Sequence, residues 1–355
     1  MPQLVLKSAA DQVAEHLREK MLSGIWSDSM PGGHRLAQEL GVNHKTVEAA
    51  LRQLETEGHL QSQGAGRPRR IVSRNQQHAP RSIRIALMLM DAADRSEDCE
   101  IELRHMLEEA GHVPFYPDKT LLDLGMDATR VARFVKRTEA DAWVISAGSK
   151  EVLEWFSQQP TPAFAFFGRR DGLPIAGAGP DKVPPTAAAT RRLIELGHRR
   201  ITLLVRKQHR LPEPTPSVRA FIDEMEARGI QVGDFNLPDW EETREGYQAI
   251  LSSLFHLTPP TAIFADESFL FIAAQQFLAR QGLRVPEDVS LICTDSDPNF
   301  AWCEPSIAHI RWDYLPVVRR IVRWAANVSI GKIDLRQTST KAEFVEGGTI
   351  GPAKS

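Results

Sequence analysis

The chain has 355 residues, which suggests two or three domains at about 150 residues each. Charged residues make up 25% and hydrophobic residues 42% of the chain, which excludes a disordered, collagen-like or coiled-coil protein. The net charge is −3, so any contact with nucleic acid requires a local basic surface. Three scattered cysteines exclude a disulfide scaffold. Without a signal-like leader or a long apolar run, we expect a cytoplasmic protein that does not enter a membrane.

Residues 1–74 form a first zone of short helical patterns. Apolar residues recur at helical spacing in three segments: Val13, Leu17 and Met21; Leu36, Ala37 and Leu40; and Val47, Ala50, Leu51 and Leu54. Gly41 is placed to end the second helix, and Asn43 is placed to cap the third. Two short helices across such a turn predict a helix-turn-helix, whose second helix would face the DNA major groove.

The segment GAGRPRRIV at residues 64–72 predicts a wing, because Gly64 and Gly66 suit a tight turn between two short strands. Residues 58–90 contain no acidic residue but carry six arginines: Arg67, Arg69, Arg70, Arg74, Arg81 and Arg84. Next to a helix-turn-helix pattern, this run favours DNA contact over a merely solvated face. The G-x-G is not followed by a helix within a βαβ unit, which disfavours a dinucleotide site.

Residues 10–72 resemble a GntR-type winged helix. The matching positions are Leu36, Ala37, Leu40, Gly41, Val42, Thr46, Val47, Ala50, Leu51, Leu54 and Gly58. The chain differs from the family pattern at the positions that usually contact DNA. Asn43-His44 stands where the family has Ser-Arg, Glu48 replaces an arginine, and His34 takes the place of a loop arginine, with Arg35 beside it.

From this pattern we expect a set of DNA-contacting residues: Arg35, Asn43, His44, Lys45, Thr46, Arg67, Arg69 and Arg70. Asparagine can pair with adenine through two hydrogen bonds, whereas Lys45 and Thr46 suit phosphate. The run Gly66-Arg67-Pro68-Arg69 resembles the core of an AT-hook, and its arginines suit a narrow minor groove.

Residues 75–83 (NQQHAPRSI) predict a linker, and the region from residue 84 to 355 changes to alternating strands and helices. The predicted strands are Ile83–Met90, Ala142–Ile145, Pro162–Phe167, Ile201–Val205, Ala262–Ala265 and Val289–Cys293. The predicted helices are Asp98–Ala110, Val183–Leu196, Ser217–Arg228 and Ser268–Gln281. This alternation predicts an α/β fold with parallel sheets and right-handed crossovers.

Four stretches of this region resemble the effector-binding domain of the LacI/GalR repressors, which is similar to periplasmic sugar-binding proteins. They are EADAWVI at 139–145, IELGHRRITL at 194–203, PPTAIFA with GLRVPEDV at 259–265 and 282–289, and EFVEGGTIGP at 343–352. The resemblance implies two α/β subdomains joined by crossing strands, a ligand clamped between them, and a homodimer. It agrees with the rule that open α/β sheets bind ligands beyond the carboxyl ends of their strands.

Candidate effector-binding residues follow from the strand ends and from the family positions: Asp91, Asp181, Ser217, Arg219, Trp240, Asp266 and Asp295. Asp91, Asp266 and Asp295 come after predicted strands, and Asp181 occupies the family's Asp-Asn position. The family's clamp arginine falls on Ser217, with Arg219 two residues further on. Because residues two apart on a helix do not share a face, either Arg219 takes the role or the arginine is absent.

Together these features predict a transcriptional regulator, by resemblance a repressor, that binds a double-stranded DNA operator as a homodimer. Its effector would be a sugar or a related polyol. The alternative is a DNA-binding regulator whose second domain is a ligand-free dimerisation scaffold or binds a non-sugar ligand. No catalytic or metal-binding spacing is evident, so we expect neither an enzyme nor a bound cofactor.

Overall fold

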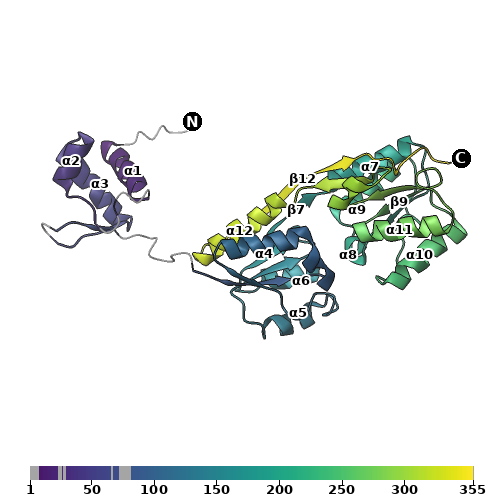
Figure 1. Cartoon of the computed structure of the whole chain (residues 1–355). Helices are drawn as coiled ribbons and strands as arrows, with labels where there is room; N and C mark the ends of the chain where they lie inside the picture. Colours follow the sequence, from purple (N-terminus) through teal and green to yellow (C-terminus); the bar gives the residue numbers. More distant parts are fainter. Residues whose placement is uncertain (1–7, 23–25, 27–28, 65–66, 72–80, 355) are drawn as a thin grey trace. The chain divides into compact units, whose positions relative to one another are not determined.

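The computed structural model describes residues 8–22, 26, 29–64, 67–71 and 81–354. The chain divides into two compact units, residues 1–81 with the short stretch 329–331, and residues 82–328 with 332–355. Figure 1 shows the helices and strands of each unit. Residues 75–80 of the predicted linker, and Gly66 of the predicted wing, lie outside the described residues.

The first unit is a three-helix domain with a small β-ribbon. Its elements are α1 (Ala9–Leu22), α2 (Gly33–Leu40), α3 (His44–Thr56), β1 (Leu60–Gln61) and β2 (Arg70–Ile71). The apolar stripes predicted from helical spacing meet in one core, in which Leu17, Leu36, Val47 and Leu51 are fully buried or nearly so. The antiparallel pairing of β1 with β2 forms the base of the predicted wing.

The turn between α2 and α3 has the predicted glycine at its start and the predicted asparagine cap at its end. Gly41 adopts φ +64°, a left-handed conformation that glycine accepts without strain, and α2 ends there. The Oδ1 atom of Asn43 accepts a hydrogen bond from the backbone N–H of Lys45 at 2.9 Å, so Asn43 caps α3. The winged helix-turn-helix prediction is therefore confirmed at the level of the backbone.

The second unit consists of two α/β lobes. In the N-lobe the strands run in the order β4-β3-β5-β6-β7, all parallel. Their bounds are β3 (Arg84–Met88), β4 (Val113–Phe115), β5 (Ala142–Ser146), β6 (Ala163–Phe166) and β7 (Ala176–Asp181). The helices α4 (Asp98–Glu109) and α12 (Leu315–Ser329) cover one face, and α5 (Ala128–Val135) and α6 (Lys150–Ser157) cover the other.

The C-lobe repeats this layering around the strands β8 (Ile201–Leu204), β9 (Ala262–Ala265), β10 (Ser290–Cys293) and β11 (Ala308–Trp312). Two of its helices, α7 (Val183–Glu195) and α9 (Pro216–Glu226), pack on one face of the sheet. Two others, α10 (Arg244–Leu257) and α11 (Ser268–Arg280), pack on the opposite face. A single helical turn, α8 (Lys207–Arg210), follows β8.

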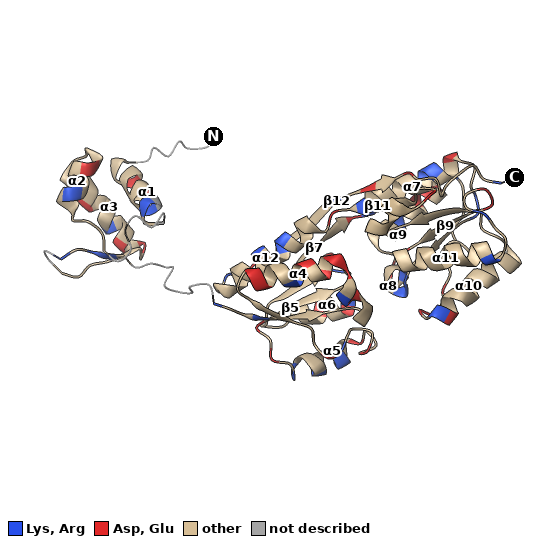
Figure 2. Ribbon diagram, viewed as in Figure 1, with Lys and Arg blue, Asp and Glu red and all other residues tan. Residues whose placement is uncertain are grey.

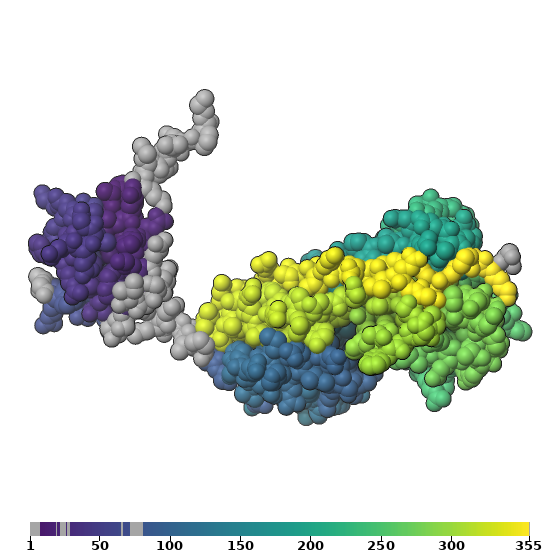
Figure 3. Space-filling model, turned by 45° about the horizontal axis from the view of Figure 1, so that its top comes forward, coloured from purple at the N-terminus to yellow at the C-terminus, as the bar shows by residue number. Residues whose placement is uncertain are grey.

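The strand β12 (Gln337–Val345) joins the two lobes into one ten-stranded sheet. Its first part pairs in parallel with β7 of the N-lobe, and its last part pairs antiparallel with β11 of the C-lobe. In Figure 3 the C-terminal segment runs along one face of this unit from lobe to lobe. The chain also crosses between lobes after β7 and after β11, so the predicted two-subdomain architecture with crossing strands is confirmed.

Two short 3₁₀ helices follow strands of this unit, η2 (Ala92–Ser96) after β3 and η3 (Pro298–Trp302) after β10. Both are capped by an aspartate, Asp91 and Asp297 respectively. Among the helices that the structure describes, none has the length and apolar character needed to cross a membrane.

Candidate functional site

The first turn of α3 presents most of the residues expected to read DNA. His44 opens the helix, Lys45 is exposed, and Thr46 is half-buried. Within the described part of the chain, Lys45 has no carboxylate within ion-pairing distance. The carbonyl oxygen of Asn43 is already used in capping, which leaves its amide N–H₂ as the free donor of that side chain.

Two imidazole rings lie face to face at the starts of α2 and α3. The ring centroids of His34 and His44 are 3.9 Å apart, with an angle of 17° between the planes. The Nε2 atom of His44 is 3.9 Å from the Oε1 atom of Glu48. Gly33 leaves the space for this arrangement, because a Cβ there would lie 2.3 Å from the Glu48 carboxylate. Sequence reasoning identified the two histidines as replacements for arginines but not as a stacked pair.

Arg69, which the sequence placed among the DNA-contacting wing residues, is held against α3. Its Nη1 and Nη2 atoms donate to the two carboxylate oxygens of Glu48 at 3.3 and 2.8 Å, and its Nε atom donates to Glu55 at 2.8 Å. The hydrogen bonds from Arg69, opposed by burial, lower the pKa of Glu48. The same bonds raise the pKa of Arg69. Both groups are therefore charged at neutral pH, and this triad attaches β2 to α3.

Other cations of the first unit remain available to a ligand. Arg67 and Arg70 are exposed on the wing, and Arg52 is exposed on α3 seven residues after Lys45. Residues seven apart lie on the same helix face, so Arg52 belongs beside Lys45 on that surface, although sequence reasoning did not include it. Arg35 pairs with Glu39 at 2.8 Å across an exposed turn of α2, a contact that phosphate can displace.

In the second unit, polar side chains gather where the C-lobe strands end. Asp266 follows β9, and the hydroxyl of Thr294, after β10, donates to its Oδ1 atom at 3.0 Å. The Nε2 atom of His209 lies 3.6 Å from the Oδ2 atom of Asp266. Burial opposes the negative charge of Asp266, but His209, Lys182 and the Thr294 hydroxyl together lower its pKa. Asp266 is therefore an ionised carboxylate.

Asp295 is bound on both carboxylate oxygens by residues of the lobe crossovers. The Nζ atom of Lys182, directly after β7, donates to Oδ2 at 3.1 Å. The indole Nε1 atom of Trp312, at the end of β11, donates to Oδ1 at 2.6 Å. Burial alone would lower the pKa of Lys182, but the nearby Asp295 and Asp266 carboxylates raise it, so the ammonium keeps its charge.

Arg206, two residues beyond the end of β8, forms the other ion pair of this region. Its Nε and Nη2 atoms donate to the two oxygens of Glu267 at 2.9 Å each, and Glu242 lies 3.7 Å away. Burial opposes the charge of Arg206, but these carboxylates hold its pKa above the ordinary arginine value. Burial raises the pKa of Glu267 to about 7, and the bonds from Arg206 oppose that rise.

The N-lobe contributes acidic residues from the segment after β3. Asp91 caps η2, and the Asp94 carboxylate accepts from the backbone N–H of Asp91 at 2.9 Å. Glu100 on α4 is buried, and the Ser146 hydroxyl at the end of β5 donates to its Oε1 atom at 2.6 Å. Burial raises the pKa of Glu100 to about 7, so its carboxyl group titrates near neutrality.

The structure also shows the surroundings of the other predicted effector residues. Asp181 is exposed and accepts from the backbone N–H of Val183. The Ser217 hydroxyl lies 3.4 Å from that of Thr215. Arg219 is exposed on α9. Trp240 packs edge-on against Tyr247 and donates to the carbonyl of Val205 at 3.0 Å, so its indole is part of the C-lobe packing.

The structure therefore brings Asp266 and Asp295 together but adds five residues that sequence reasoning missed: Lys182, Arg206, His209, Glu267 and Trp312. The available signal was position: Lys182, Arg206, Glu267 and Trp312 lie at the end of a strand or within two residues of it, whereas His209 lies in the α8 turn that follows β8. The loop after β8 also touches the N-lobe, where the Arg169 Nη1 atom donates to the carbonyls of Gln208 and Leu211 at 2.8 Å each. In Figure 2 the ribbon at α8 is coloured blue where its basic residues lie.

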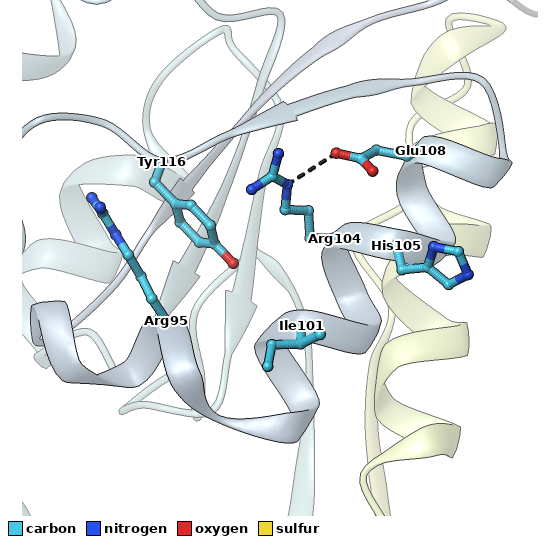
Figure 4. Close-up of a pocket in the computed structure, with 6 residues that line it drawn as sticks. All are labelled: Arg95, Ile101, Arg104, His105, Glu108 and Tyr116. Atoms are coloured by element: carbon cyan, nitrogen blue, oxygen red, sulfur yellow. Dashed lines mark hydrogen bonds and ion pairs between the residues drawn. The ribbon is translucent and has the colours of Figure 1, made fainter.

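A surface pocket of about 410 Å³ lies on the N-lobe. Figure 4 shows its lining, in which Tyr116 lies between the guanidinium groups of Arg95 and Arg104. Arg104 is already paired with Glu108 at 2.9 Å. All of the lining residues belong to the N-lobe, and Arg95 comes from η2, the 3₁₀ helix that Asp91 caps.

Each of the two units contains a region that matches a protein-family model. Residues 9–67 match the model described as bacterial regulatory proteins of the gntR family. Residues 190–350 match the model of a periplasmic binding protein-like domain. The chain thus carries a GntR-type helix-turn-helix domain and a periplasmic-binding-protein-like domain. Both matches are to regulatory or binding modules rather than to enzymes, in agreement with the expectation from sequence.

Relatives with curated names are transcriptional repressors. The repressor PurR of Pasteurella multocida is 32% identical over 115 residues, covering 30% of this chain and 32% of that protein. The repressor CytR of Escherichia coli K12 is 28% identical over 131 residues, covering 37% and 38% respectively. The matched region thus spans 32% and 38% of the length of these two relatives.

Solved structures confirm the fold. A complex of the regulator CelR with cellobiose aligns with a TM-score of 0.62 at 17% identity, covering 90% of this chain and all of that one. A LacI-family regulator of Enterococcus faecium with bound ribose aligns with a TM-score of 0.59 at 16% identity, covering 76% of this chain and all of that one. The fold of the second unit is therefore that of LacI-type regulators.

Proposed function

Because the chain joins a GntR-type helix-turn-helix domain to a domain with the fold of LacI-type regulators, we propose that it is a transcriptional repressor controlled by a small-molecule effector. The observation that carries the proposal is that one chain has two distinct polar surfaces, one on each unit. One is the exposed cationic face of α3 and the wing, and the other is the polar cluster at the strand ends between the lobes. The proposed domain boundaries are residues 1–74 for DNA binding and 84–355 for effector binding.

In the DNA-binding role, four exposed cations contact the phosphates or a groove of the DNA: Lys45, Arg52, Arg67 and Arg70. His44 and Asn43 face the edges of the bases. The exposure of these cations and their freedom from ion pairs in the described residues support this assignment. Counterion release from such contacts supplies much of the affinity for DNA, whereas base contacts supply the specificity.

In the effector-binding role, the ligand binds between the lobes against Asp266, Asp295 and Arg206. A saccharide or polyol suits this site, because its hydroxyl groups can both donate to carboxylates and accept from Arg206 or Lys182. The regulators CelR and that of Enterococcus faecium were solved with cellobiose and ribose respectively, which supports the same class for this chain. The alternative is that the second domain binds a non-sugar ligand or none, and serves as a dimerisation scaffold.

The proposed assembly is a homodimer that binds a two-half-site operator, since one helix-turn-helix makes few base contacts. Exposed apolar side chains of the C-lobe support it: Phe269 is 54% and Ile272 47% exposed on α11, and Trp302 is 90% exposed on η3. The two elements pack together through Phe271 and Phe300, whose rings are 5.7 Å apart. Such an apolar surface favours a protein partner, here a second copy. A repressor of this kind acts in the cytoplasm.

The proposal is tested by selecting DNA from a random pool with the purified full chain and then screening sugars, sugar acids and sugar phosphates by thermal shift. We expect an enriched, partly palindromic sequence and at least one compound that raises the melting temperature. Asp266→Asn should abolish that stabilisation while DNA binding persists. A pool that shows no enrichment would refute the DNA-binding role, and stabilisation that survives Asp266→Asn would move the effector site elsewhere.

A further inference from the structure

We infer that Arg169 of the N-lobe is a positioning residue of the interlobe site. It holds the C-lobe turn after β8, residues 206–213, in place beside Asp266. This inference rests on the proposed function and adds the residue through which the geometry of the site depends on contact between the lobes. It is carried by direct hydrogen bonds from one lobe to carbonyl groups that the other lobe leaves without a donor.

The turn after β8 has two carbonyl groups that its own helix does not satisfy. Because α8 is a single helical turn, the carbonyl of Gln208 would need the backbone N–H of residue 212 as its helical partner. That residue is Pro212, which has no N–H. In the described part of the chain, no C-lobe group donates to the carbonyls of Gln208 or Leu211. Both oxygens therefore depend on water or on a donor from outside the C-lobe.

Arg169 supplies that donor from the N-lobe. Its Nη1 atom donates to both carbonyl oxygens at 2.8 Å each, and its side chain is only 10% exposed. Since Nη1 carries two hydrogens, it can serve both acceptors at once, and hydrogen bonds from a charged donor are the stronger kind. Glu213, the last residue of the turn, lies 3.9 Å from Nη2 of Arg169 and accepts from Nζ of Lys150 at 3.3 Å.

The N-lobe backbone that presents Arg169 is tightly constrained. Gly168 adopts φ +71°, and a Cβ there would lie 2.6 Å from the carbonyl oxygen of Gly148. The backbone N–H of Arg169 donates to that same oxygen at 3.0 Å. Phe167 and Ala147, which directly follow β6 and β5, adopt φ +62° and +52°, a region that non-glycine residues rarely enter. Such strained backbone persists where the surrounding structure fixes it, and it is typical of functional sites.

The turn that Arg169 holds also carries two residues of the polar cluster. The backbone N–H of Arg206 donates to Oδ2 of Asp266 at 3.4 Å, and its side chain is paired with Glu267. The Nε2 atom of His209 lies 3.6 Å from the same Asp266 oxygen. Both side chains take their positions from the path of this turn. A displacement of the turn would therefore move both of them relative to Asp266.

Two further contacts join the N-lobe to the same region. The Nε2 atom of Gln208 donates to the Sδ atom of Met90, after β3, at 3.3 Å. The ring of Phe167 packs edge-on against Trp312, with 5.4 Å between the centroids. In Figure 1, α8 lies on the side of the C-lobe that is nearest the N-lobe. The loop after β6 thus contacts the cluster region at two points, through Phe167 and through Arg169.

The first test needs no ligand. Arg169→Met retains the apolar stem and removes the donors, and hydrogen exchange of the full-length protein is followed by mass spectrometry. We expect the amides of residues 207–211 to exchange about tenfold faster, while those of β9 stay unchanged. Arg200→Met is the matched control, because Arg200 donates to the carbonyl of Pro259 at 2.8 Å within the C-lobe. It should leave exchange in the turn unchanged.

Arg169→Lys separates the loss of the hydrogen bonds from the loss of the side chain. Its ammonium keeps the charge and carries three donors, so it should restore part of the protection that Arg169→Met removes. The inference is overturned if the turn exchanges equally in the wild-type protein and in Arg169→Met. It is also overturned if exchange in β9 rises as much as exchange in the turn, since a general loss of stability is not positioning.

The second test adds ribose and cellobiose, the ligands of the two solved regulators, and measures binding by calorimetry. A sugar that binds the wild-type protein should bind Arg169→Met about tenfold more weakly and Arg200→Met equally well. Equal affinity for the wild-type protein and Arg169→Met would overturn the inference and leave the sensing role intact. If neither sugar binds the wild-type protein, the proposed sugar class loses its support, and the exchange experiment alone decides the inference.

Discussion

At the scale of single residues, the first unit differs most from the GntR pattern at the positions that we expect to face DNA. Glu48, His34 and His44 occupy positions where the family usually has arginine. Arg69 is already hydrogen-bonded to Glu48 and Glu55. The positive charge that remains comes from a few exposed side chains: Lys45, Arg52, Arg67 and Arg70. Loss of any one of them should therefore be measurable.

Lys45→Ala is expected to weaken DNA binding about uniformly across sequences. Loss of one phosphate contact should also reduce the slope of log affinity against log salt by about 1. Fluorescence anisotropy at several salt concentrations measures both quantities. Lys332→Ala, an exposed lysine of the second unit, serves as the matched control. An unchanged slope in Lys45→Ala would show that the first turn of α3 does not approach the DNA backbone.

Glu100 makes stability depend on pH in a defined direction. Its carboxyl ionises at pH 4.5 in the unfolded chain and at about 7 in the folded chain, because burial disfavours the charge. Between these values the unfolded state has already lost the proton, so the folded state becomes less stable as the pH rises. The contribution is on the order of 3 kcal/mol, and Glu100→Gln should remove it. Denaturant unfolding from pH 4.5 to 7.5 measures the effect, and parallel profiles for the two proteins would contradict it.

At the level of residues, the sequence predicts positions best where a general rule applies, and whether these positions bind an effector stays a prediction. Asp266 and Asp295 were predicted because ligands bind beyond the carboxyl ends of strands, and the structure places both after C-lobe strands. Lys182, Arg206 and Trp312 obey the same rule but were missed, because long side chains reach the site from positions whose direction the sequence does not reveal. Trp240 was predicted as a candidate effector-binding residue, and its indole N–H donates to the carbonyl of Val205 within the C-lobe.

At the scale of elements, the triad of Arg69 with Glu48 and Glu55 joins the wing to α3. Arg69→Met retains the apolar stem but removes three hydrogen bonds, and leaves two carboxylates without their partner. Because these groups are partly exposed, we expect a loss of about 1–2 kcal/mol in the stability of the first unit.

Hydrogen exchange measured by mass spectrometry over residues 9–71 detects this loss as faster exchange in Arg69→Met. Arg35→Met breaks only the exposed pair with Glu39 and should leave exchange nearly unchanged. Equal exchange in the two variants would mean that the wing does not depend on the triad.

The ends of helices were predicted correctly where a single residue sets the boundary through its backbone conformation or a capping hydrogen bond. Gly41 ends α2 with a positive φ and Asn43 caps α3, both as the sequence indicates. The strand β12 was not predicted, because its residues are mostly polar and half-exposed, and its pairing is set by β7 and β11, which are distant in sequence. The helix α12 belongs to the N-lobe although it follows a C-lobe strand, an assignment that only the crossover topology provides.

At the scale of the whole molecule, the proposed homodimer has a direct test. Trp302→Ser replaces a side chain that is 90% exposed on η3 and should shift the protein toward a monomer at low concentration. Light scattering coupled to size exclusion measures the mass as a function of concentration. Leu257→Ser, an exposed residue at the end of α10, is the control. A monomeric wild-type chain would contradict the proposed assembly.

The central claim is that ligand binding between the lobes and DNA binding by the first unit are thermodynamically linked. The most direct measurement is a titration of the selected DNA sequence with the full-length protein, with and without a compound that stabilises it. We predict a change in DNA affinity of about 5- to 150-fold, absent in Asp266→Asn although that variant binds the DNA. An affinity that stays the same when the wild-type protein is saturated with ligand would contradict the account.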